Sequence, residues 1–368
     1  MTPPRPIEFV HLLVTAQCRN RCAFCFNSGN VPAAGAELAT EGWISILNQV
    51  AELPALRYVF LLEREPLERP DLVRLLDVLR RSRAQIFLCS GGSDLFTEET
   101  ACDLSTRVDG FIASFHGNVG VLNDVTYDRQ RQMLARLGRH FVGKPVNLDI
   151  NTTVTRLHKG RLMSIVQESA RLLGRHPVVE SSGRQKVVRY AGPGGTTEPQ
   201  RIRHNFVRPC LEGGMLREQE KLFWTQAERE WFGEEADFLR WGENCYADVD
   251  RPLESFSTSV NGRPCGFSYD SQGAAGFNRL TIRWDGKIIP CASNPGFVMG
   301  DAASQALEEI WKQAYHLWRV PDVINAYTLF HAFPGGHCIY HQDAAFRPGA
   351  LDEEILAQCR KIAERNAS

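Results

Sequence analysis

The chain has 368 residues, of which 43% are hydrophobic and 23% are charged, and its formal net charge is −1. This balance is typical of a soluble globular protein and excludes a general electrostatic attraction to nucleic acid or to a membrane surface. The N-terminus lacks the pattern of a signal peptide, and no apolar run reaches the roughly 18 residues of a membrane-spanning helix. We therefore expect a cytoplasmic protein, with neither nucleic acid nor a membrane as partner.

The first half of the chain alternates short runs rich in β-branched and aromatic residues with segments of helical spacing. Strands are predicted over residues 9–15, 57–63, 85–92, 110–117 and 146–155. Helices are predicted over residues 43–53, 71–82, 97–105, 127–140 and 161–174. One or two further strands are expected in 177–195, before a Gly/Pro-rich exit. Such alternation predicts an α/β fold with a parallel sheet covered by helices, either a barrel or a doubly wound sheet.

The second half has a different pattern. Residues 217–242 are expected to be largely helical, and residues 279–291 to form a hairpin that turns at Asp285 and Gly286. Further helices are predicted over 304–318 and 351–366, with a loop bearing Cys and His at 334–343 between them. We expect four segments: a barrel over 1–205, a helical connector over 206–262, a small α+β subdomain over 263–345 and a C-terminal helix over 346–368.

Three cysteines, Cys18, Cys22 and Cys25, follow the first predicted strand at the spacing C-x3-C-x2-C. Because cytoplasmic thiols stay reduced, metal ligation or catalysis is favoured over disulfides. A structural zinc ion needs four ligands, and the nearest further candidate, His11, lies inside a predicted strand. Ordinary core packing fits a polar Arg/Asn loop poorly. Three thiolates could instead hold three corners of a four-iron cluster and leave the fourth iron open for a ligand.

This spacing, with Phe24 directly before the last cysteine, resembles the signature of the radical S-adenosylmethionine (SAM) enzymes. The segments "EREPLERPDL", "LCSGG", "SFHG" and "INTTVT" also resemble segments that follow or end later strands in that family. The resemblance covers roughly the first 200 residues and implies a partial (β/α)6 TIM-like barrel. It also implies a [4Fe-4S] cluster on Cys18, Cys22 and Cys25 that binds SAM, with Phe24 as a cofactor-binding residue.

One segment departs from the family pattern, in which G-G-E-P holds the methionine amino group of SAM through backbone carbonyls and the Glu. Glu65 and Pro66 match this pattern, whereas Glu63 and Arg64 stand where the family has glycines. We expect Glu65 to bind the cofactor. The two bulky side chains must point away from the ligand, or the contact geometry differs.

Polar residues on the next strands are further candidates for the site. Ser114 and Asn151 are expected to contact the carboxylate or the ribose of SAM, with an ordinary strand-end role as the alternative. His116 fits a structural role better, as turn histidines usually do. Cys89 and Cys102 are expected to be core residues.

The C-terminal third resembles the auxiliary-cluster extension of many radical SAM enzymes, called SPASM in its long form and twitch in its short form. The resemblance rests on Cys291, five residues after the hairpin glycine, with Cys265 before the hairpin and Cys338 after a helix. It implies one auxiliary [4Fe-4S] cluster on these three cysteines. The fourth ligand stays open between Cys245, His341 and substrate; the alternatives are a zinc site or a fold without a cluster.

Family membership would imply reductive cleavage of SAM and abstraction of a hydrogen atom from substrate, with electrons from a reductant such as flavodoxin or ferredoxin. Because the motif begins at residue 18, we expect no leader-binding domain before it and favour a small polar, carbohydrate- or aminocyclitol-like substrate. Dehydrogenation and epimerisation are both compatible with the sequence; an epimerase would need a hydrogen donor such as Cys210 or Cys245. The alternatives are a peptide-modifying radical enzyme and a non-catalytic iron–sulfur or zinc protein.

Overall fold

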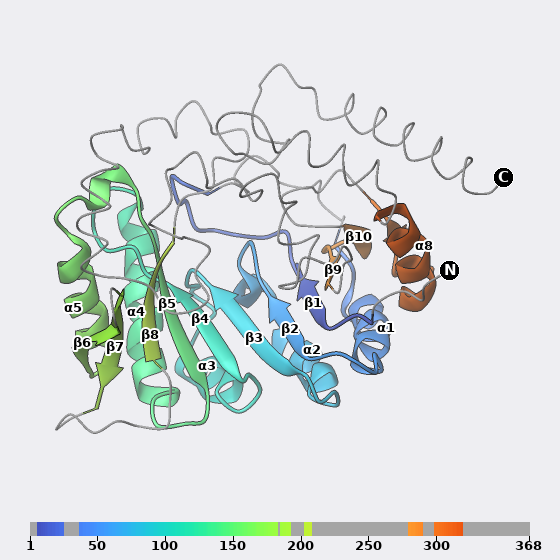
Figure 1. Ribbon diagram of the computed structural model, residues 1–368, viewed down its shortest axis with the longest axis horizontal. Coiled ribbons are helices and arrows are strands. Elements are labelled where there is room, and N and C mark those ends of the chain that lie inside the picture. The colour runs from blue at the N-terminus through green and yellow to red at the C-terminus, as the bar shows by residue number, and fades with distance from the viewer. Residues whose placement is uncertain are drawn as a thin grey trace, which may run out of the picture.

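A computed structural model describes residues 6–25, 37–182, 185–192, 202–207, 279–289 and 298–318. In these segments the strands form one eleven-stranded sheet, and helices α1 to α5 cover one of its faces (Figure 1). No helix among these residues is both long and apolar enough to cross a membrane. The helices expected over 217–242 and 351–366, and the Cys/His loop at 334–343, lie outside the described residues.

The centre of the sheet is parallel and follows the order of the chain, except that β8 takes the sixth place. Its strands are β1 (Phe9–Leu12), β2 (Tyr58–Leu61), β3 (Gln85–Ser90), β4 (Gly110–Ser114), β5 (Asn147–Thr153) and β8 (Ile202–Val207). Sequential order with one helical layer is the arrangement of an open β/α barrel, whereas a doubly wound sheet has helices on both faces. The expected partial barrel is therefore confirmed.

The helices between these strands lie close to their predicted ranges. They are α1 (Thr40–Ala51), α2 (Leu72–Leu79), α3 (Glu98–Leu104), α4 (Asp124–His140) and α5 (Leu162–Leu172), with short 3-10 turns at η1 (Pro66–Glu68) and η2 (Arg156–His158). Helix α4 begins three residues earlier than expected, because Asn123 caps it: its side-chain oxygen accepts a hydrogen bond from Thr126 N at 2.8 Å.

The sixth barrel strand lies further along the chain than the sequence indicated. Residues 177–195 supply an antiparallel hairpin, β6 (His176–Ser182) and β7 (Gln185–Ala191), at the outer edge of the sheet. The parallel partner of β5 is instead β8, beyond the Gly/Pro-rich segment that was expected to be the exit. This strand spans the expected boundary at residue 205.

On the other edge, the predicted hairpin over residues 279–291 joins the same sheet. Strand β9 (Arg279–Ile282) pairs in parallel with β1, and β10 (Lys287–Ile289) returns antiparallel to it. The turn lies at Asp285 and Gly286 as predicted, and Gly286 N donates to Arg283 O at 2.9 Å. A short β11 (Gly300–Asp301) and α8 (Leu307–Trp318) follow. Because β9 is parallel to β1, its turn lies at the edge where β1 ends.

The two faces of the central strands are buried to different degrees. On β1, β2 and β3, every second residue is fully buried against the helices, and the residues between them are half-buried on the inner face. Near the amino ends, aromatic rings fill the inner face: Phe9 stacks on Tyr58 at 5.1 Å and Phe60 on Phe87 at 5.0 Å between ring centroids. A Cβ at Gly110 would lie 2.3 Å from the Phe87 ring, so this position requires glycine.

Candidate functional site

The cysteine loop leaves the carboxyl end of β1 and is fixed by backbone contacts at several points. Leu13 N donates to Ile282 O at 2.9 Å, which ties the start of the loop to β9. Ala23 N donates to Val121 O at 3.0 Å, and a tight turn brings Cys25 N to Cys22 O at 3.1 Å. These backbone contacts fix the position of the loop relative to β9 and to the segment before α4. Cys18, Cys22 and Cys25 are all partly accessible.

The environment of Cys18 and Cys22 disfavours their ionised forms. Burial, with nearby Glu65 and Cys25, raises the pKa of Cys18 to about 11. Burial raises the pKa of Cys22 still further, and the Cys25 and Cys18 charges add to it. Thiolates that repel one another in this way are stabilised by a bound cation, and iron binding would deprotonate them outright.

The donor set of the loop, three thiols close together in the chain, fits an iron–sulfur cluster. Across the described residues, no group of three or more His, Cys, Asp or Glu side chains is placed to hold one ion. The three thiols of the loop are nevertheless close enough to perturb one another's pKa. Three neighbouring thiols are the donor set that a four-iron cluster bound at three corners needs.

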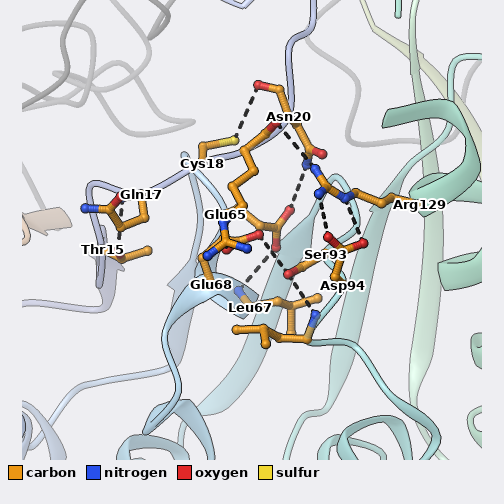
Figure 2. Close-up of polar contacts among 12 residues, drawn as sticks. Thr15, Gln17, Cys18, Asn20, Glu65, Leu67, Glu68, Ser93, Asp94 and Arg129 are labelled. Atoms are coloured by element: carbon orange, nitrogen blue, oxygen red, sulfur yellow. Dashed lines mark hydrogen bonds and ion pairs between the residues drawn. The ribbon is translucent and has the colours of Figure 1, made fainter. Parts of the chain in front are cut away.

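Glu65 lies at the centre of a hydrogen-bonded clamp beside this loop (Figure 2). Its side chain is fully buried. The oxygen Oε1 accepts from Ser90 Oγ at 2.8 Å and from Leu67 N at 3.2 Å. The oxygen Oε2 accepts from Gly91 N at 2.8 Å and from Asn20 Nδ2 at 3.4 Å. The expected cofactor-binding residue therefore also joins the cysteine loop to the end of β3.

Burial raises the pKa of Glu65 to about 7, although the hydrogen bonds from Ser90, Gly91 and Leu67 oppose this effect. A buried carboxylate is costly unless a cation pairs with it. The ammonium of an amino acid bound beside Glu65 would supply such a cation. The clamp thus fits the amino group of SAM electrostatically.

Asn20, which the sequence analysis did not single out, is the second polar group of the clamp. Its Nδ2 donates to Gly92 O at 2.8 Å and also faces Glu65, so both of its neighbours are acceptors. This fixes the orientation of the amide. Its Oδ1 is buried and has no hydrogen-bond partner among the described residues. This buried oxygen, next to Glu65, is available to accept a hydrogen bond from the N–H groups of an ammonium ligand.

Charged residues hold the outer side of the same loop (Figure 2). Arg19 Nε lies 3.1 Å from Glu68 Oε2, and Ser93 Oγ donates to Glu68 Oε1 at 2.9 Å. Arg129 Nε donates to Asp94 Oδ1 at 2.9 Å. Arg129 Nη1 also donates to Arg19 O at 3.4 Å, so Arg19 connects the loop to η1 and to α4.

Glu63 and Arg64 adopt a backbone conformation that normally requires glycine. Their φ angles are 62° and 51°, the only positive values among non-glycine residues in the described segments. The left-handed conformation costs an L-residue roughly 1–2 kcal/mol. The chain therefore keeps the backbone expected of the family's glycines while carrying two charged side chains there.

The remaining expected site residues lie at the same edge of the sheet. Ser114 is in register with Asn151, and both are half-buried on the inner face. The Phe24 ring packs edge-on against His116 at 4.6 Å between centroids. The structure thus brings Phe24, Ser114 and Asn151 to the end of the sheet that carries the cysteine loop.

His116 has the structural role that the sequence favoured. Its Nδ1 accepts from Thr153 N at 2.9 Å, and its backbone oxygen lies 3.0 Å from His158 Nε2. Burial holds its pKa well below the usual range, so the ring is neutral.

Deeper on the inner face, Arg203 donates to both carboxylate oxygens of Asp149, at 2.8 and 3.1 Å.

The expected auxiliary-cluster ligands cannot be placed in the same way. Cys265, Cys291 and Cys338 lie outside the described residues, as do Cys210, Cys245 and His341. The described part of this region is the hairpin of β9 and β10 with β11 and α8. The assignment of these three cysteines to a cluster therefore stays a prediction from the sequence.

Comparison with known proteins adds to this geometry. Residues 274–326 match the family model of the SPASM iron–sulfur cluster-binding domain. A PqqA peptide cyclase of Gluconobacter oxydans is 37% identical over 92 residues, which is 25% of this chain and 25% of the cyclase. The matched stretch is thus a quarter of that relative's length.

Two solved structures share the fold. anSMEcpe with bound AdoMet has a TM-score of 0.55 at 13% identity, with 98% of both chains covered. Streptococcus suis SuiB bound to its precursor peptide SuiA has a TM-score of 0.53 at 16% identity, with 83% of this chain and 64% of SuiB covered.

Proposed function

We propose that this chain, which belongs to the radical SAM enzymes that carry a SPASM iron–sulfur domain, modifies a peptide substrate. The observation that carries the proposal is the 37% identity to a PqqA peptide cyclase. The fold shared with SuiB, which was solved with a precursor peptide, agrees with it. These comparisons favour a peptide over the small polar substrate that the sequence suggested.

Within this function, each group at the carboxyl ends of the strands has a separate task. Cys18, Cys22 and Cys25 hold the [4Fe-4S] cluster by three irons. Glu65 and Asn20 hold the SAM amino group between a carboxylate and an amide oxygen. When bound, the cluster and SAM supply reductive cleavage of SAM and abstraction of a hydrogen atom from substrate.

Residues on the neighbouring strands complete the cofactor site in this proposal. Ser114 and Asn151 present polar groups to the carboxylate or the ribose of SAM. Phe24, held by His116, presents an aromatic face next to the last thiol. An external one-electron reductant such as flavodoxin or ferredoxin supplies the electron. The SPASM region holds one auxiliary [4Fe-4S] cluster on Cys265, Cys291 and Cys338.

The test begins with anaerobic reconstitution with iron and sulfide. Iron per chain and 5′-deoxyadenosine formed with dithionite are measured for the wild type and for a Cys18→Ala/Cys22→Ala/Cys25→Ala variant. We expect about eight irons to fall to about four, and deoxyadenosine to form only in the wild type. A fully loaded wild type that makes no deoxyadenosine, with or without the substrates described next, would contradict the radical mechanism.

The substrate class is tested with two sets of probes. One is a library of synthetic peptides of defined sequence, and the other is a set of aminocyclitols and sugars. We expect only peptides to increase deoxyadenosine formation, with a mass change in the peptide. An increase confined to the aminocyclitols or sugars would overturn the peptide proposal and restore the small polar substrate.

A further inference from the structure

The segment before Glu65 carries a cation that the family's pattern does not contain. Arg64 occupies the position of the second glycine of G-G-E-P and keeps its left-handed backbone, with a φ of 51°. Strained non-glycine residues persist only where their surroundings hold them, and they gather at functional sites.

The Arg64 guanidinium contacts a side chain that belongs to the other end of the sequence. Its central carbon lies 5.9 Å from the centroid of the Trp284 ring. Trp284 is in the β9–β10 turn, inside the stretch that matches the SPASM domain. A cation over an indole face is favourable, and more so when it is shielded from water.

Trp284 is itself held close to the cysteine loop. It is only 8% exposed and packs in a small apolar cluster with Leu13 and Ala16, which precede Cys18 by a few residues. The backbone oxygen of Trp284 also accepts a hydrogen bond from Leu38 N at 2.8 Å. The ring is therefore a fixed platform, and it limits where the guanidinium of Arg64 can go.

The charge of Arg64 acts on the thiols of the loop. Burial lowers the pKa of Arg64, while the charges of Cys25, Cys18 and Glu63 raise it. The backbone places Arg64 beside this loop, because Glu65 N donates to Gln17 O at 3.1 Å, so the residue before Glu65 lies next to the residue before Cys18. Glu63, the other residue in the glycine positions, carries the opposite charge, which also raises the pKa of Arg64.

We propose that Arg64 is a positioning residue that holds a permanent positive charge beside Cys18 and Cys25, fixed there by Trp284, and thereby raises the reduction potential of the cluster. Reduction adds one negative charge to the cluster, and a nearby cation stabilises the reduced form more than the oxidised form. The SPASM hairpin then influences the SAM site through one side chain. The inference rests on the proposed function only in requiring a four-iron cluster on these cysteines.

The neighbouring residue provides a matched control. Glu63→Gly and Arg64→Gly each replace a strained residue with glycine at adjacent positions, so both relieve the same kind of backbone strain. Arg64→Gly removes a positive charge, whereas Glu63→Gly removes a negative one, so their electrostatic effects on the cluster have opposite signs. Arg64→Lys keeps a positive charge but loses the planar group that stacks on Trp284.

The experiment is an EPR-monitored redox titration of the cluster on Cys18, Cys22 and Cys25, with iron per chain measured for each reconstituted variant. We expect Arg64→Gly to shift the midpoint potential to a more negative value. Glu63→Gly should not shift it to a more negative value, because it removes a charge of the opposite sign, and Arg64→Lys should lie between the wild type and Arg64→Gly.

A cluster loaded equally in all variants with the same midpoint in Arg64→Gly would overturn the inference and leave the proposed function intact. An equal shift in Glu63→Gly and Arg64→Gly would also overturn it, because strain would then be the cause. A wild type that binds no reducible cluster on these cysteines would overturn both.

Discussion

The two ends of the inner face of the barrel differ in what they bury. At the amino ends of the strands, stacked aromatic rings from Phe9, Tyr58, Phe60 and Phe87 fill the space. At the carboxyl ends, the chain instead buries a carboxylate, Glu65, inside a set of hydrogen bonds. Packed rings stabilise the fold without further partners. A buried carboxylate is stable only in its protonated form or beside a cation, so one end serves stability and the other binding.

The largest expected effect is a pH dependence of the free energy of unfolding that comes from the buried Glu65. Because the folded metal-free chain raises the pKa of Glu65 from 4.5 to about 7, the folded state holds this proton more tightly than the unfolded chain. The contribution is fully present below about pH 4.5 and is lost as the pH rises through about 7. At 1.36 kcal/mol per pKa unit, the loss is about 3 kcal/mol.

Urea unfolding of the metal-free protein between pH 4.5 and 8 measures this loss, with Glu65→Gln as control. Glutamine keeps the shape but does not titrate, so the variant should lack this component of the pH dependence. The same pH dependence in the wild type and in Glu65→Gln would contradict the assignment of the buried charge to Glu65.

Glu65→Gln should also weaken the binding of SAM. The substitution removes the negative charge opposite the proposed ammonium, and charge-assisted hydrogen bonds contribute about 1.5–3 kcal/mol. We expect the Kd of SAM for the reconstituted protein to rise roughly tenfold to a hundredfold, measured by equilibrium dialysis, with iron per chain unchanged. A variant that binds SAM as tightly as the wild type would remove Glu65 from the cofactor site.

A substitution at the aromatic end should lower the stability of the fold without weakening the binding of SAM. Gly110→Ala would place a Cβ 2.3 Å from the Phe87 ring, and overpacking of this kind costs about 1–3 kcal/mol. Urea unfolding should show this loss, while iron per chain and the Kd of SAM in the folded protein stay at wild-type values. A loss of SAM binding without loss of stability would contradict the claim that the aromatic end serves stability and the other end binding.

A smaller effect is expected for Asn20→Ala. It removes the buried oxygen that the described residues leave without a partner, and one neutral hydrogen bond contributes about 1 kcal/mol. We expect the Kd of SAM to rise about fivefold, less than in Glu65→Gln, in the same dialysis measurement. Ser93→Ala, which removes the contacts of the Ser93 hydroxyl with Glu68 and with Leu95 N but none with Glu65 or Asn20, is the control that should leave the Kd unchanged.

The sequence predicted the parts of this structure that depend on local patterns. The first five barrel strands and the β9–β10 hairpin lie where alternation and turn residues indicated. The sixth strand was misplaced because residues 177–195 have equally good strand propensity, and only pairing across the sheet decides that β8 joins β5.

Side-chain environments were predicted less well, because they depend on contacts between distant residues. Asn20 was missed because its partners Glu65 and Gly92 are 45 and 72 residues away. The prediction that Cys102 is a core residue was wrong, since α3 leaves it exposed. Glu63 and Arg64 were expected to point away from the ligand or to alter the contact geometry. No local pattern indicated that they would keep the glycine backbone or that Arg64 would reach Trp284.

The most direct test of the site at the carboxyl ends is EPR spectroscopy of the reduced, reconstituted protein with and without SAM. If Cys18, Cys22 and Cys25 leave one iron open beside Glu65 and Asn20, SAM should change the spectrum of the wild-type cluster. The signal that remains in the Cys18→Ala/Cys22→Ala/Cys25→Ala variant should not respond. A fully loaded wild type whose spectrum is identical with and without SAM would contradict the account.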